Sequence, residues 1–158
     1  MAARKTEQPK DRHVLIAVDQ TENSKRAVLY VADFLGGNPG FRATLLSVVP
    51  KPEEDLFENE EERSAWAKEK VTAANALLNR YREVLIHSGF PEDKVQIRSC
   101  VGEDKSLSEI ILEYQCEMSC CTVVVGRHHK SKAEEFLFGS TSSQLVHRAE
   151  NCAVWVVE

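Results

Sequence analysis

The sequence predicts an α/β domain in which a parallel sheet carries helices on both faces. Short β-branched apolar runs alternate with helical patterns along nearly the whole chain, and the connections between them are short. Strict alternation of this kind is typical of parallel sheets with right-handed crossovers. The length of 158 residues fits a single domain. We expect residues 13–158 to form it and residues 1–12 to be a flexible polar tail.

The first strand and helix are the clearest pair in the pattern. Residues 14–18 are apolar throughout, which predicts a strand buried on both faces. Thr21 is a good N-cap for the helix that follows. The apolar positions of that helix recur at helical spacing and comprise Ala27, Val28, Val31, Ala32 and Leu35.

A second apolar strand is predicted over residues 44–49, before two prolines. The acidic segment 53–62 contains little to bury, so we interpret it as a solvated loop that runs into a glutamate-rich helix start. The long amphipathic helix that follows carries its apolar side chains every three or four positions as far as Leu85. Gly89 and Pro91 are expected to end it.

The remaining elements differ in how they are buried. Residues 94–101 alternate between apolar and polar, which favours an edge strand. Ser106 begins a third helix in a capping box, and residues 122–125 form another buried strand. Thr141 and Gln144 predict a second capping box that opens the fourth helix. The run Ala153–Val157 is the last strand.

Composition excludes several classes of protein. The net charge of −5 argues against a general nucleic-acid binder. The longest apolar runs have the length of strands, so no membrane span or secretory signal is predicted. The five cysteines are odd in number and form no CxxC pair, which favours buried structural thiols in the cytoplasm over disulfides or a metal site. Cys100, Cys121 and Cys152 lie in or beside strands and are expected to be buried.

One stretch suggests a ligand. The strand over 122–125 ends at Gly126, a basic loop follows, and Gly139 then leads into hydroxyl residues at a helix start. Glycines let backbone N–H groups approach phosphate oxygens, and a helix N-terminus favours an anion. The alternative is that the two glycines only permit turns and that the hydroxyl groups only cap the helix.

The spacing Gly126-x2-His129-x9-Gly139-Ser140 resembles the Gly-x2-Gly-x9-Gly-Ser/Thr pattern of nucleotide-binding universal stress proteins. The strand ends at residues 17–19 and 47–50 and the C-terminal residues 151–157 also resemble that family, so the likeness extends over about 13–157. It implies a Rossmann-like sheet of five parallel strands in the order 3-2-1-4-5. It also implies ATP or another adenine nucleotide as ligand, with or without Mg²⁺, and no other cofactor.

The resemblance assigns roles residue by residue. Asp19 and the Ala17 backbone would contact base and ribose, Val48 the adenine, and Gly126 the phosphates or ribose. The full set implied or suggested by position is Ala17, Val18, Asp19, Val48, Gly126, Arg127, His129, Gly139, Ser140, Thr141 and Ser142. Asp19 is also a common type of helix-capping residue. His129 stands where the family has its middle glycine, so it either weakens binding or donates to a phosphate.

Two functions remain open. The first is a cytoplasmic stress or regulatory protein that binds nucleotide, and the alternative is an interaction module of the same fold that has lost it. We predict no catalytic residue, no metal site and at most slow incidental ATP hydrolysis, because residues 19–24 lack the glycines of an adenylating loop. We also predict a homodimer through the apolar last strand, which comprises Ala153, Val154, Trp155, Val156 and Val157.

Overall fold

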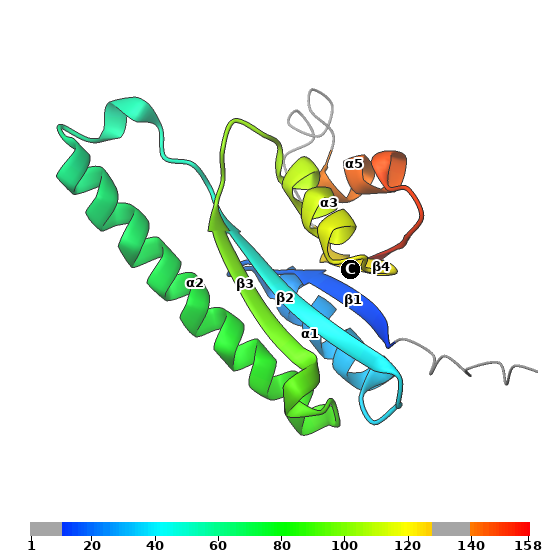
Figure 1. The fold of residues 1–158 in the computed structure, drawn as a ribbon. Coiled ribbons are helices and arrows are strands. Elements are labelled where there is room, and N and C mark those ends of the chain that lie inside the picture. Colours follow the sequence, from blue (N-terminus) through cyan, green and yellow to red (C-terminus); the bar gives the residue numbers. More distant parts are fainter. Residues whose placement is uncertain (1–10, 128–139) are drawn as a thin grey trace, which may run out of the picture.

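The computed structural model describes residues 11–127 and 140–158, and the chain alternates between strands and helices (Figure 1). The strands are β1 (Arg12–Ala17), β2 (Phe41–Val49), β3 (Val95–Val101), β4 (Thr122–Gly126) and β5 (Ala153–Val157). The α-helices are α1 (Glu22–Leu35), α2 (Glu60–Ser88), α3 (Leu107–Glu117) and α5 (Thr141–Arg148), with short 3-10 turns η1 (Glu54–Leu56) and η2 (Glu92–Lys94). The predicted tail lies outside the described residues up to residue 10, and β1 begins at Arg12.

All five strands form one parallel sheet in the order β3-β2-β1-β4-β5, which confirms the predicted fold class. Ile16 at the centre of β1 faces Leu45 on β2 and Val124 on β4. The half-polar strand β3 lies at one edge, as its alternation predicts, and β5 lies at the other. The carboxyl ends of the strands therefore meet along one side of the sheet, where parallel α/β folds place their ligands.

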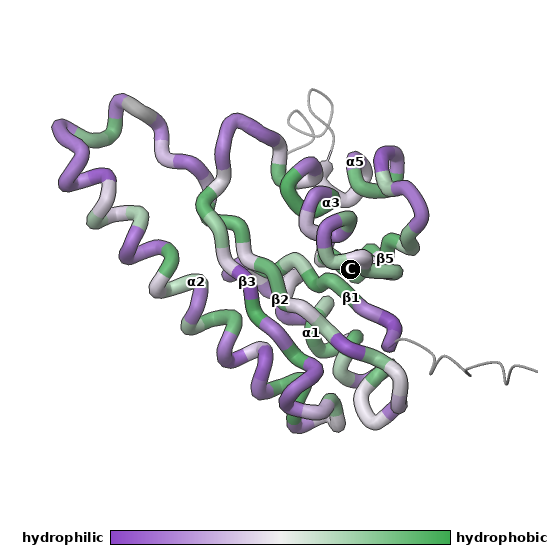
Figure 2. The backbone as a smooth tube through the Cα atoms, in the orientation of Figure 1, coloured by the Kyte–Doolittle hydropathy of each residue, from purple (hydrophilic) through white to green (hydrophobic). Residues whose placement is uncertain are grey.

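Strand β1 is buried on both faces because its side chains alternate between two cores. Val14 and Ile16 belong to a cluster built with α1 and α2, whereas Leu15 belongs to a second cluster built with α3 and α5. Each of these three side chains is at most 1% exposed. The apolar colouring in Figure 2 is concentrated along β1 and β2, between the helical layers.

Helix α1 forms as the sequence predicts. Its N-cap is Thr21, whose hydroxyl group accepts from the Ser24 N–H at 3.3 Å. All five of its predicted core positions are buried: Ala27, Val28, Val31, Ala32 and Leu35. Hydrophobic burial of that stripe is what holds the helix on the sheet.

Helix α2 is longer than the layer it covers. Asn59 caps it by accepting from the Glu62 N–H at 2.9 Å, and Gly89 ends it at a φ of 118°, a conformation that favours glycine. Its buried side chains lie only in the second half, between Ala74 and Leu85. The first half extends past the end of the sheet (Figure 1).

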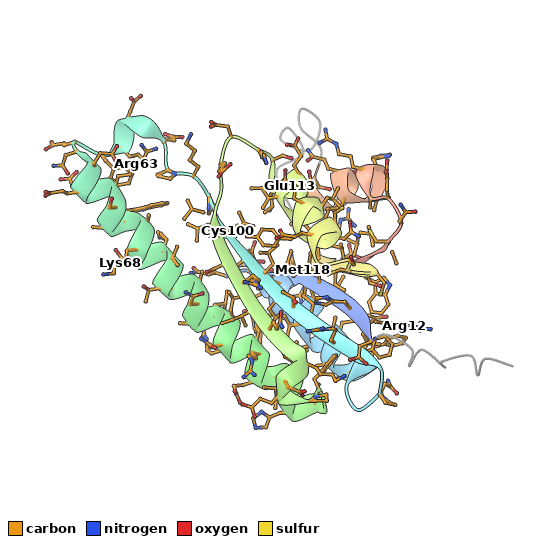
Figure 3. All side chains as sticks on the ribbon, viewed as in Figure 1. Arg12, Arg63, Lys68, Cys100, Glu113 and Met118 are labelled. Carbon is orange, nitrogen blue, oxygen red and sulfur yellow. The ribbon has the colours of Figure 1, made fainter. Side chains whose placement is uncertain are left out.

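The cysteines depart from expectation at one position. All five are free thiols, and Cys120 is 2% exposed. Cys100 on the edge strand β3 (Figure 3) and Cys152 are half-buried, but Cys121 is exposed, so its predicted burial is wrong. The reason is its position one residue before β4, where the chain leaves the turn after α3 and the core no longer covers both faces. Among the described residues, no helix is long and apolar enough to cross a membrane.

Candidate functional site

A cavity of about 170 Å³ opens at the carboxyl ends of β1, β2 and β4, and we call it the strand-end cavity. Its lining residues are Ala17, Val18, Asp19, Ser24, Leu46, Val48, Pro50, Leu107, Ile111, Val125, Gly126 and Thr141. The strand ends form its floor, α3 forms one wall, and the first residue of α5 lies at its edge. The walls are mainly apolar, with polar groups at a few points, as is usual for small-molecule sites.

The structure brings together six of the predicted site residues in this cavity. They are Ala17, Val18, Asp19, Val48, Gly126 and Thr141. Four segments far apart in the sequence supply them, and the parallel sheet places these segments side by side because each follows or ends a strand or begins a helix. His129 and Gly139 lie outside the described residues.

Asp19 is held in place at the start of α1. One of its carboxylate oxygens accepts from the Thr21 N–H at 2.9 Å, the Thr21 hydroxyl at 2.5 Å and the Ser24 hydroxyl at 2.8 Å. Three donors on one oxygen fix the turn between β1 and α1. Asp19 is therefore not the cap of α1, because Thr21 is the N-cap, but its carboxylate fixes the turn that leads into the helix. The same residue also lines the cavity, so one side chain can serve both structure and ligand contact.

Gly126 is required by the close packing of the end of β4 on the start of α1. A Cβ atom at this position would lie 2.4 Å from the carbonyl oxygen of Asn23 and 2.9 Å from the Ser24 nitrogen. The Asn23 side-chain amide also donates to the Arg127 carbonyl oxygen. The end of β4 is thus fastened to the start of α1. Sequence reasoning missed this requirement, because it depends on where two distant elements cross.

Arg127 does not line the cavity. Its guanidinium group pairs with the Glu158 carboxylate at 2.9 Å, and its backbone N–H donates to the Val157 carbonyl oxygen at 2.8 Å. Both contacts join the end of β4 to the end of β5. The structure therefore gives this predicted site residue a position beside the C-terminus, where half of its surface is exposed.

The start of α5 differs by one residue from the predicted capping box. Ser140, not Thr141, is the N-cap, and its hydroxyl accepts from the Ser143 N–H at 3.1 Å. The Gln144 side-chain oxygen accepts from the Ser108 hydroxyl of α3 at 2.7 Å. The box over Thr141 and Gln144 is therefore wrong. Ser140 fits the cap because it is 9% exposed, extended, and directly precedes the helix.

The three hydroxyl residues at this helix start have separate positions. The Ser140 and Ser142 hydroxyl groups lie 3.0 Å apart, and Thr141 faces the strand-end cavity. Free N–H groups and the helix dipole give the first turn of α5 a positive character. An anionic group at the edge of the cavity would meet that turn.

A second cavity of about 560 Å³ lies on the α2 side of β2, and we call it the tryptophan-side cavity. It shares Asp19, Val48 and Pro50 with the strand-end cavity and extends to Trp66 and Lys70 on α2. The sequence interpretation treated the acidic segment before α2 as solvated, and it missed that this segment and α2 line a cavity.

The signal for the second cavity was the aromatic content of the acidic segment. Phe57 packs against Trp66 with ring centroids 5.8 Å apart, and the Lys70 ammonium lies 5.9 Å from the Trp66 ring centroid. These contacts hold the indole where α2 leaves the sheet. Over the parts of the chain that the structure describes, no group of three His, Cys, Asp or Glu side chains could hold a metal ion.

The comparisons with solved structures agree with this fold. Universal stress protein UspA from Lactobacillus plantarum is 16% identical, with a TM-score of 0.75 over 96% of this chain and 100% of that one. A universal stress protein in complex with cAMP is 17% identical, with a TM-score of 0.70 over 93% of this chain and 97% of that one. One from Archaeoglobus fulgidus in complex with dAMP is 15% identical, with a TM-score of 0.58 over 96% and 100%.

At such identities the structural likeness establishes the fold alone. A search of curated protein sequences finds no significant match. The model of the universal stress protein family matches residues 11–158, which is nearly the whole chain. The chain therefore belongs to the universal stress protein family.

Proposed function

We propose that the protein binds an adenine nucleotide, ATP or AMP, in the strand-end cavity and acts as a cytoplasmic stress or regulatory protein. Binding, rather than turnover, is its activity in this proposal. The five free thiols fit a reducing compartment. The observation that carries the proposal is the meeting of six separately predicted residues, Ala17, Val18, Asp19, Val48, Gly126 and Thr141, around one cavity.

The chemistry of the lining supports a nucleotide in one orientation. Val48, Leu107 and Ile111 offer apolar surface to a flat base, and Asp19 offers carboxylate oxygen to base or ribose. The cavity of about 170 Å³ is smaller than the roughly 300–1,000 Å³ of sites that enclose a whole small molecule. The base and ribose therefore occupy the cavity, and the phosphates extend toward the first turn of α5.

The solved relatives support the ligand class. Two of them are complexes with adenine nucleotides, cAMP in one and dAMP in the other. Both share the fold with this chain at under 20% identity. The identity of the nucleotide here is a separate question, because His129 replaces a glycine of the family pattern.

Titration calorimetry with ATP, ADP, AMP and cAMP tests the proposal. His129→Gly is expected to tighten ATP binding, because a side chain at a position suited to glycine costs about 1–3 kcal/mol, or roughly 5- to 150-fold in affinity. Gly139→Val and Asp19→Ala are expected to weaken binding. Asp19→Asn is the matched control for the turn, because its amide oxygen keeps the acceptor for Thr21 and Ser24 while the charge is lost.

A specific observation favours the alternative of a dimeric interaction module. β5 is an edge strand with Ala153 exposed and Val156 41% exposed. Beside it, Tyr30 and Phe34 of α1 stack at 5.7 Å between ring centroids, and both are packed edge-on against Trp155. Phe34 is 58% exposed, so an apolar surface continues from the strand onto the helix. A second copy paired antiparallel on β5 would cover both.

Sedimentation velocity at micromolar concentration measures the dimer. Val156→Lys is the sharper variant, because it places a charge on the exposed strand face, whereas Trp155→Asp also removes a ring from the α1 side of the core. The charged variant is expected to sediment as a monomer with unchanged circular dichroism. A monomeric unmutated protein at the same concentration would refute the dimer and leave the nucleotide proposal intact.

A further inference from the structure

Two cysteines lie at the amino ends of β4 and β5, at the opposite end of these strands from the strand-end cavity. The parallel ladder between these strands begins with Thr122 facing Ala153. The Ala153 N–H donates to the Cys121 carbonyl oxygen at 2.9 Å. Cys121 and Cys152 each lie one residue before this first pair.

Extending the register by one residue would place the two backbones at the separation that a disulfide needs. Neighbouring strands lie about 4.7–4.9 Å apart, and disulfides join residues whose Cα atoms are about 4.4–6.8 Å apart. The hydrogen bond from Ala153 holds the chains together at this level. Both residues lie just before the regular strands: the Cys121 N–H donates to the His13 carbonyl oxygen at 2.9 Å, and Cys152 follows Asn151, whose φ is 56°.

The two thiols differ in exposure. Cys121 is exposed, whereas Cys152 is half-buried against the core cluster of α3 and α5. Burial raises the pKa of the Cys152 thiol, and the neighbouring Cys121 raises it further. Because Cys121 is exposed and Cys152 is half-buried, an oxidant in solution meets Cys121 first.

The other nearby cysteines are placed less favourably. Cys120 is 2% exposed, and burial raises the pKa of its thiol to about 12. Its carbonyl oxygen accepts from the Gln115 side-chain amide at 2.9 Å, which fixes this turn. Cys116 is exposed but lies in the last turn of α3, two residues before the C-cap Met118 labelled in Figure 3, and is not part of β4.

We propose that Cys121 and Cys152 form a reversible disulfide, with a low-molecular-weight disulfide such as glutathione disulfide as the oxidant. The Cys121 thiolate attacks one sulfur of the oxidant, and one glutathione thiolate leaves. The Cys152 thiolate then attacks the Cys121 sulfur of the mixed disulfide, and the second glutathione leaves. Two protein thiols are oxidised, one disulfide is reduced to two thiols, and the two protons pass to the glutathione thiolates.

The bridge closes a defined part of the chain. Residues between Cys121 and Cys152 include β4, the segment between Gly126 and Ser140, and α5. A cross-link over such a loop stabilises mainly by restricting the unfolded chain. The pair lies at the opposite end of β4 from Gly126, so oxidation is expected to raise stability and to leave nucleotide affinity unchanged. The inference does not depend on the proposed nucleotide function.

The test is peptide mapping of the folded protein after incubation with glutathione disulfide and quenching with an alkylating agent. Non-reducing trypsin digestion should join peptides 106–127 and 149–158, with the loss of two hydrogen atoms. Fragmentation should place the bond on Cys121. The thermal unfolding midpoint of the oxidised protein should rise by roughly 4–12 °C and return after reduction.

Single variants make the assignment specific. Cys121→Ser and Cys152→Ser should each abolish the linked peptide and the rise in midpoint, and the exposed-cysteine control Cys116→Ser should retain both. A glutathione adduct on Cys121 without an internal bond would overturn the proposal. A bond through Cys120 or Cys116, or one between two chains on a non-reducing gel, would overturn it as well.

Discussion

The two faces of the sheet are filled to different degrees. On the face covered by α1 and α2, a continuous cluster extends from Val14 to Val124 and includes Val31, Leu78 and Leu85. On the other face, α3 and α5 cover a smaller cluster around Leu15, Ile111 and Leu145. The strand-end cavity lies on this second side, between α3 and the strand ends.

The lengths of the helices explain the difference. Among the described helices, α1 and α2 have 14 and 29 residues, of which the second half of α2 packs on the sheet, whereas α3 and α5 have only 11 and 8. The same strands supply side chains to both faces. The carboxyl ends of the strands decide the end of the sheet at which a ligand fits, and the larger tryptophan-side cavity lies at the same strand ends on the α2 side. Among the residues that the structure describes, the shorter layer of α3 and α5 leaves apolar strand ends open beside the start of α5.

The filled face should show the largest response to a deletion. Leu78 of α2 is fully buried, so Leu78→Ala removes buried apolar surface and leaves a cavity that the neighbouring side chains fill only in part. The free energy of unfolding is expected to fall by about 2–5 kcal/mol. Urea denaturation followed by circular dichroism measures it, with the exposed residue Leu56 changed to Ala as control. Equal effects at the two leucines would contradict the described core.

The contact between the end of β4 and the start of α1 should be the next most sensitive to substitution. Gly126→Ala places a Cβ atom against the Asn23 carbonyl group, which is backbone and cannot turn away. We expect a loss of about 1–3 kcal/mol of stability. Gly102→Ala is the matched control, since its nearest non-neighbouring atom would be 3.3 Å away. If Gly126→Ala is as stable as that control, the close packing of β4 on α1 is refuted.

Enlarging one side chain on each face compares them directly. Val31→Phe overfills the α1–α2 face, where the side chain is fully buried, and should cost about 1–3 kcal/mol. Val48→Phe extends into the strand-end cavity and should cost less than about 1.5 kcal/mol. Nucleotide affinity should fall in the Val48→Phe variant and stay unchanged in the Val31→Phe variant. Denaturation and calorimetry measure both quantities. A larger loss of stability in Val48→Phe than in Val31→Phe, with nucleotide affinity lost only in Val31→Phe, would contradict the position of the strand-end cavity.

The smallest expected effect concerns His13, near the amino end of β1. Burial lowers the pKa of His13 below 6.5, and the charge of Arg42 lowers it further, so the folded protein favours the neutral ring. An unfolded chain binds a proton near pH 6.5 that the folded chain resists, so this contribution to stability is present above that pH and declines as the pH falls below it. His13→Gln should flatten the dependence of unfolding free energy on pH in that window. An unchanged slope would show that the ring is as free to protonate in the folded state as in the unfolded one.

The fold was predictable because local pattern and tertiary structure agree. Residues 14–18 are apolar at every position, which is typical of a strand covered on both faces, and β3 alternates as an edge strand does. The predicted first and last residues of the helices and strands were less accurate. Ser140 and Thr141 are both good N-caps, so the sequence alone placed the start of α5 one residue too late.

The candidate site was predictable to the extent that it follows strand ends. Val48, Asp19 and Gly126 each close a strand, and parallel pairing brings them together. The packing of Gly126 on Asn23 and the direction of Arg127 toward Glu158 depend on how distant segments cross, which no local pattern encodes. The exposure of Cys121 likewise depends on the turn after α3.

The central claim is that the uncovered strand ends on the α3–α5 side bind an adenine nucleotide. Titration of the unmutated protein with ATP, beside Val48→Phe, tests it most directly. We predict one site per chain with a dissociation constant on the order of 1 µM to 1 mM, and loss of the binding heat in Val48→Phe. The contrary result is no heat with ATP, ADP or AMP from either the unmutated protein or His129→Gly, which would leave the dimeric interaction module as the function of this chain.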